Sequence, residues 1–169
     1  MRASLDQRSP WPGLAGLVIS LVLALIVEAL SARVLGSGAP FPNLVLIALF
    51  IWSVRRPLFL APPILLIAGL AHDLFSGGPL GVWALAYLAA FAAARDREAD
   101  GTGSDFGPLI ARFAVLAGVA IFAAWAAGSV SVGFPAPAGG LILEGVLTIL
   151  LFAASGWAFT RRRERTSFF

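Results

Sequence analysis

The sequence predicts an all-α, polytopic membrane protein: one integral membrane domain, residues 1–169, folded as a single six-helix transmembrane bundle. Hydrophobic residues make up 59% of the 169 residues, and the mean hydropathy is +0.91. This leaves too little polar sequence to cover a soluble globule of that length. The apolar residues form six runs, and most arginines lie between them. Both observations indicate several crossings of a bilayer.

Each apolar run is expected to form one helix, because about 20 apolar residues cross roughly 30 Å of hydrocarbon. The second and fourth runs are short, so their helices either begin in the flanking Pro/Gly segments or depend on local thinning of the bilayer. Pro62, Pro63 and Pro108 fall at helix starts, where a missing N–H is tolerated. The expected spans are 12–34, 41–54, 58–75, 80–94, 108–128 and 140–160.

The arginines test the number of crossings independently, because cytoplasmic loops retain positive charge. With six crossings and a cytoplasmic N-terminus, only Arg33 falls outside, and Arg112 lies near the cytoplasmic end of the fifth span. Five crossings would place the C-terminal arginine cluster outside. We therefore expect both termini in the cytoplasm. The arginines on that side are Arg2, Arg8, Arg55, Arg56, Arg95, Arg97, Arg161, Arg162, Arg163 and Arg165.

The composition argues against several classes of function. The chain has no cysteine and one histidine, so neither a thiolate site nor a metal site built on histidines is expected. The pI of about 11 comes from dispersed arginines without a nucleic-acid motif, so we expect contacts with lipid head groups and none with nucleic acid. Without a serine–histidine pair or a phosphate loop, no catalytic residue or cofactor is predicted.

The first run carries small residues at four-residue spacing, namely Gly16, Ser20 and Ala24. Small residues let helix backbones approach closely in lipid. This face is therefore predicted to contact a helix, either within the bundle or in a partner protein, and we slightly favour the partner. Glu28 continues the face and would add a hydrogen bond to that contact.

Three acidic side chains lie inside the expected spans: Glu28, Asp73 and Glu144. An ionisable group in lipid costs on the order of 3 kcal/mol, so each needs a partner, a structural task or a function. The expected topology places all three in the outer half of the membrane. This predicts a polar patch that opens outward, with Arg33 and His72 as its cationic candidates.

Each polar residue also has a structural interpretation. Glu28 and Glu144 can be protonated and hydrogen-bonded within the bundle, and His72 is either a packing side chain or a proton relay. Asp73 precedes the turn at 76–79, where its oxygens can accept backbone N–H bonds. Asn43 is expected to start the second helix.

Residues from Pro42 to about Phe91 resemble the MreD family of bacterial rod shape-determining proteins. The pattern opens with Pro42-Asn43 before an apolar span and continues with a basic-proline break at Arg56-Pro57. Its most specific part surrounds the next turn. That part comprises Gly69, Asp73, Ser76-Gly77, Leu80-Gly81 and Ala84-Leu85.

The resemblance implies a non-enzymatic scaffold of the cell-elongation complex in the bacterial inner membrane, which helps to control lateral peptidoglycan synthesis and cell shape. Such proteins bind the bitopic membrane protein MreC. Through this complex they associate with the elongation transpeptidase, the glycan polymerase and the actin-like MreB filament.

The family fold is also similar to the substrate-binding subunits of energy-coupling-factor vitamin transporters, so a solute-binding subunit is the alternative. A solute binder needs a sealed, ligand-sized pocket with converging polar or aromatic groups, whereas a scaffold needs a groove for a partner helix. The loop at 129–139 has no charged group to hold a charged solute, which favours the scaffold. A channel or proton-coupled carrier that uses the three acids is a third possibility.

The arginine asymmetry predicts where reporter fusions will be found. Fusions after the cytoplasmic arginines should give a cytoplasmic signal, and fusions in the three outer loops should give an external one. A cytoplasmic signal in the last outer loop would contradict the six-crossing topology. The fusion points are Arg56, Arg97 and Arg165 on the cytoplasmic side, and Gly38, Gly77 and Pro137 on the outer side.

Overall fold

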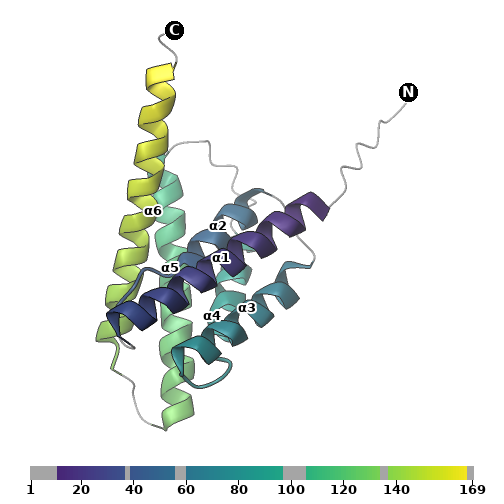
Figure 1. Cartoon of the computed structure of the whole chain (residues 1–169), viewed down its shortest axis with the longest axis vertical. Helices are drawn as coiled ribbons and strands as arrows, with labels where there is room; N and C mark the ends of the chain where they lie inside the picture. Colours follow the sequence, from purple (N-terminus) through teal and green to yellow (C-terminus); the bar gives the residue numbers. More distant parts are fainter. Residues whose placement is uncertain (1–10, 37–38, 56–59, 97–105, 134–136, 167–169) are drawn as a thin grey trace, which may run out of the picture.

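A computed structural model of the chain is all-helical, as expected (Figure 1). It describes residues 11–36, 39–55, 60–96, 106–133 and 137–166, and these ranges contain no strand. Each helix coincides with one of the apolar runs. The helices are α1 (Trp11–Leu35), α2 (Leu44–Arg55), α3 (Ala61–Ser76), α4 (Val82–Asp96), α5 (Phe106–Val132) and α6 (Gly139–Thr166).

Three of the described helices contain segments long and apolar enough to cross a membrane: Gly13–Val34 of α1, Gly107–Val132 of α5 and Gly139–Gly156 of α6. This is compatible with a membrane protein. The apolar segments of α3 and α4 are shorter, and α3, with 16 residues, extends only about 24 Å. The two short runs do not gain length from the Pro/Gly segments, because α2 begins at Leu44 and α4 at Val82.

Prolines lie at two helix starts, where N–H groups lack intrahelical partners. Pro62 and Pro63 fall in the first turn of α3, as expected. Helix α5 begins at Phe106, two residues before the expected start, so Pro108 is its third residue and still lies in the first turn.

The core forms where α2 and α4 meet the surrounding helices. Helix α4 packs against α3 and α5, and α2 packs against α1, α4, α5 and α6. In Figure 1, α5 and α6 run antiparallel along the longest axis, and α1 crosses them obliquely. Phe50, Phe113 and Phe152 join α2, α5 and α6, with ring centroids 4.2–5.3 Å apart. The short helix α2 is therefore held on several sides.

Helices α3 and α4 touch through their backbones at Gly69. A Cβ atom added to Gly69 would lie 2.3 Å from Ala84 Cα and 2.5 Å from Ala84 N, so no side chain fits there. The connecting turn begins at Gly77, whose left-handed conformation (φ +69°) ends α3, and reaches α4 through Gly81 (φ +97°). Gly77 and Gly81 were both predicted to belong to this turn. Each has a positive φ angle, which a residue with a side chain would adopt only with strain.

The small-residue face of α1 is covered by α2. A Cβ atom added to Gly16 would lie 2.4 Å from Trp52 Cη2, and Trp52 Nε1 donates a hydrogen bond to Ser20 Oγ at 3.0 Å. Ala24 is also buried. The expected helix contact is present, but it lies within the chain. Our preference for a partner protein at this face was wrong, because four-residue spacing predicts a close contact without identifying the second helix.

The contact at Gly69 gives a sharp stability test. Gly69→Ala should destabilise the folded protein by about 1–3 kcal/mol or more, because the clash is with backbone atoms that cannot rotate away. Thermal unfolding in detergent measures the change. The control is Gly118→Ala in α5, where the added methyl meets open space and should be neutral or stabilising. Equal melting temperatures for both variants would contradict the close α3–α4 contact.

Candidate functional site

Polar side chains from four helices meet at one end of the molecule. We refer to Glu28, Asn43, His72, Tyr87, Glu144 and Thr148 as the polar cluster. Glu28 comes from the C-terminal half of α1 and His72 from that of α3, whereas Asn43 directly precedes α2. The predicted polar patch comprised Glu28, Asp73 and Glu144 together with Arg33 and His72. The structure brings Glu28, His72 and Glu144 together in the polar cluster, whereas Asp73 and Arg33 lie outside it.

Asn43 lies at the centre of the polar cluster and is 1% exposed. Its Oδ1 accepts the N–H of Leu46 at 3.0 Å, which caps α2 as expected for a helix-start asparagine. The same oxygen accepts the Tyr87 hydroxyl at 3.2 Å. Its Nδ2 donates to Glu144 Oε1 at 3.1 Å, and its backbone N–H donates to Thr148 Oγ1 at 2.7 Å. One residue thus joins α2 to α4 and α6.

Glu28 provides a second set of bonds to the start of α2. Its Oε1 accepts the backbone N–H of Leu44 at 2.6 Å and that of Val45 at 3.3 Å. These N–H groups have no acceptor inside the helix, and the positive end of the helix dipole favours a carboxylate there. Glu28 therefore stabilises the start of α2. It also forms the expected hydrogen bonds at a helix contact, here between α1 and α2.

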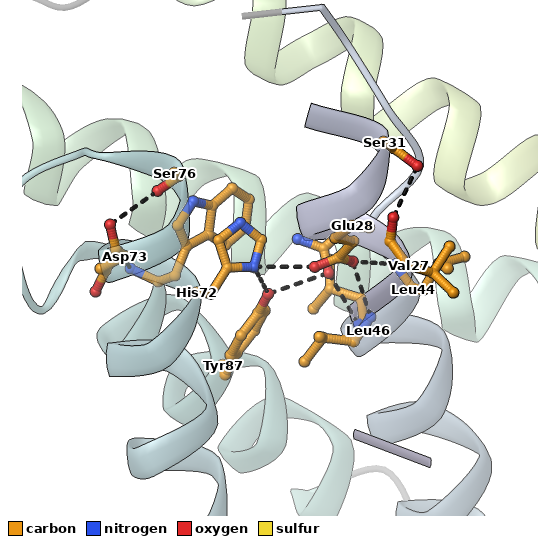
Figure 2. Close-up of polar contacts among 12 residues, drawn as sticks. Val27, Glu28, Ser31, Leu44, Leu46, His72, Asp73, Ser76 and Tyr87 are labelled. Carbon is orange, nitrogen blue, oxygen red and sulfur yellow. Dashed lines mark hydrogen bonds and ion pairs between the residues drawn. The ribbon is translucent and has the colours of Figure 1, made fainter. Parts of the chain in front are cut away.

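His72 links Glu28 to Tyr87, as Figure 2 shows. Its Nδ1 lies 2.7 Å from the Tyr87 hydroxyl oxygen and 3.2 Å from Glu28 Oε2. The Tyr87 hydroxyl has one proton. When that proton points to Asn43, His72 Nδ1–H donates to Tyr87; when it points to His72, Nδ1 accepts it. The His72 ring also stacks on Trp83, with centroids 4.8 Å apart.

Asp73 has a different task from its neighbour His72. Its Oδ2 accepts the N–H of Gly81 at 2.7 Å, and its Oδ1 accepts the N–H of Trp83 at 3.0 Å. The prediction that Asp73 locks the turn through backbone N–H groups is confirmed. The donors, however, lie at the start of α4, beyond the expected residues 76–79. Asp73 is 1% exposed and both oxygens are used, so it is a structural group that positions Trp83.

An open cavity of about 350 Å³ adjoins the polar cluster. Its polar and aromatic lining comes from Glu28, Asn43, His72, Trp83 and Glu144. Small and apolar residues complete the wall. They are Ala32, Gly36, Ala39, Pro40, Phe41, Ser76, Pro137, Gly140 and Leu141. A smaller cavity of about 70 Å³ also contacts Glu28 and His72, beside Leu25 and Phe75.

The predicted patch also differs from the structure in one cationic residue that it included and one aromatic residue that it omitted. Arg33 is exposed and does not line either cavity, so His72 is the cationic candidate that reaches the polar cluster. Sequence reasoning missed Tyr87, although it is the one tyrosine of the chain and lies in an apolar run. Among the described residues, no group of three or more His, Cys, Asp or Glu side chains can hold a metal ion.

Comparison with known proteins adds no family assignment: no family model, curated protein or solved structure matches the chain. The geometry of the polar cluster and the cavity is therefore the basis for assigning a role to this end of the molecule. That geometry provides a set of fixed hydrogen-bonding groups beside an open cavity.

Substitutions of Asp73 separate its hydrogen bonds from its charge. Asp73→Asn keeps one carbonyl acceptor and should be milder than Asp73→Leu, which leaves two N–H groups unpaired at about 1–3 kcal/mol each. Folded yield and thermal unfolding in detergent provide the measurements. Ser76→Ala, which removes only a hydroxyl bonded to the Asp73 carbonyl, is the control. If Asn were as damaging as Leu at equal protein level, the charge of Asp73 would be its main contribution.

Proposed function

We propose that this chain is a non-enzymatic scaffold of the bacterial cell-elongation machinery, with all six helices crossing the inner membrane and both termini in the cytoplasm. In this proposal it resembles the MreD family and binds MreC directly. Through MreC it meets the elongation transpeptidase, the glycan polymerase and MreB, and so helps to control lateral peptidoglycan synthesis and cell shape.

The observation that carries this proposal is that several residues of the family-like pattern have a structural task. Asn43 caps α2, Gly69 permits backbone contact between α3 and α4, and Asp73 caps α4. Gly77 and Gly81 have the positive φ angles of the intervening turn. A pattern of separated residues that serves one backbone arrangement is a signature of a fold, which supports the resemblance. The function then follows by analogy with that family.

Pro42 is a further member of the pattern and directly precedes the capping residue, whereas Arg56-Pro57 lies outside the described residues. A proline favours an extended chain before it and has no N–H to satisfy, so it suits the approach to a helix start. The contact with MreC lies outside the Gly16–Ser20–Ala24 face in this proposal, because Trp52 already occupies that face.

One observation favours the second candidate, a substrate-binding subunit of a vitamin-type transporter. The open cavity beside the polar cluster has a volume of about 350 Å³, within the range of small-ligand pockets. Polar and aromatic groups converge on it, which is the arrangement expected of a solute binder. Because the cavity is open, it lacks the seal that we expect of such a subunit, and the scaffold remains our main proposal.

Co-purification distinguishes the two candidates. The chain should be expressed with tagged MreC from the same cells, extracted in mild detergent and analysed for bound proteins and small molecules. The scaffold proposal predicts that MreC retains the chain through the purification. Gly118→Ala should behave like the unchanged chain, because its methyl group meets open space. A tightly bound vitamin together with no retention by MreC would replace the scaffold with the transporter subunit.

A further inference from the structure

We infer that the cavity of about 350 Å³ binds a small organic cation, whose guanidinium or ammonium group pairs with Glu28 and Glu144. This inference goes beyond the proposed scaffold function and does not depend on it. A scaffold requires no ligand at this end of the molecule, and a solute-binding subunit would not by itself specify a cationic solute.

The charge of the cavity lining is the first argument. The described lining residues include two carboxylates, Glu28 and Glu144, and neither arginine nor lysine. His72 is the one basic side chain among the described lining residues, so it can pair with at most one of the two acidic side chains. A cavity with an excess of acidic groups and a low-dielectric surrounding attracts cations and disfavours anions.

A buried carboxyl oxygen without a hydrogen bond is the second argument. Glu28 Oε2 is buried and receives no hydrogen bond from the described residues, although His72 Nδ1 lies 3.2 Å away. The same nitrogen is closer to the Tyr87 hydroxyl, at 2.7 Å. Buried carboxylate oxygens normally have donors. Since Glu28 also lines the cavity, a ligand N–H group can supply the missing donor.

The remaining polar groups have defined orientations. Glu144 Oε1 accepts a bond from Asn43 Nδ2 at 3.1 Å, and a carboxylate has further acceptor capacity for a ligand. Trp83 is fixed by the bond from its N–H to Asp73 and by stacking on His72. An indole ring attracts cations on its face. The site is thus largely formed before a ligand arrives.

The size of the cavity limits the ligand. Its volume lies at the lower end of the range for small-molecule pockets, which favours a compact solute over a lipid head group with attached chains. Guanidinium has planar N–H donors that match carboxylates in pairs, so we choose methylguanidinium as the probe. N-methylurea has a similar planar shape and no charge, and serves as the matched neutral compound.

The experiment measures binding of each compound to the purified full chain in detergent at neutral pH, by isothermal titration calorimetry. Methylguanidinium should bind in a saturable way with a roughly millimolar dissociation constant, as expected for so few atoms. N-methylurea should bind at least about tenfold more weakly, because charge-assisted hydrogen bonds are lost. Equal binding of both compounds, or no saturable binding of methylguanidinium, would overturn the inference.

Variants locate the site. Glu144→Gln should weaken methylguanidinium binding about tenfold, and Glu28→Gln should do the same while its amide oxygen still accepts from α2. Arg33→Gln changes the charge near the same end but does not line the cavity, and should bind as the unchanged chain does. Thermal unfolding identifies any variant that fails to fold. Unaltered binding by folded Glu144→Gln would overturn the inference, whatever the outcome for Glu28→Gln.

The cation can belong to a free solute or to an arginine side chain of a membrane partner. If MreC retains the chain, as the scaffold proposal predicts, the titration is also repeated on the purified complex to identify the source. Unchanged binding identifies a free solute as the source, whereas loss of binding in the complex identifies a side chain of the partner. Both results support a site for a guanidinium or ammonium group. Binding that persists in the complex after Glu144→Gln would count against it.

Discussion

The arrangement of this molecule depends on how the N–H groups at the start of α2 are satisfied. Helix α2 has only 12 residues, yet it contacts α1, α4, α5 and α6. Glu28 accepts the N–H groups of Leu44 and Val45, and Asn43 accepts that of Leu46. In an apolar environment, free N–H groups are costly, so these acceptors fix both the start of α2 and the position of α1 beside it.

Glu28, Asp73 and Glu144 all lie in apolar segments of the sequence, but the structure gives them different hydrogen-bond donors. Asp73 uses both oxygens for the backbone of α4, and Glu28 uses one oxygen for the backbone of α2. Glu144 instead accepts a hydrogen bond from the side-chain amide of Asn43. The number of backbone N–H groups taken by each carboxylate therefore decides how much of it is left for a ligand. By this measure Glu28 and Glu144 keep acceptor capacity that Asp73 has used.

Local patterns predicted the elements of this fold well, and the long-range contacts poorly. The apolar runs predict all six helices, and the Asp73–Gly81 segment predicts its own turn, because both depend on neighbouring residues. Asn43 and Thr148 are 105 positions apart, and no sequence spacing relates them. Likewise, Gly16 and Ser20 predict a close helix contact, but only the folded chain identifies Trp52 as their partner. The cavity depends on such contacts and was not predictable.

The separation of these contacts along the chain has a consequence for biosynthesis. A chain is made from its N-terminus, so Glu28 is present before the amides of α2, which lie 16 and 17 positions later. The α1–α2 hairpin can therefore complete these bonds as soon as it is made. Asn43, by contrast, must wait for Glu144 and Thr148, which are the last residues of the polar cluster to be translated. Until α6 is made, the side-chain amide of Asn43 needs another acceptor, such as water, and α6 then completes the polar cluster.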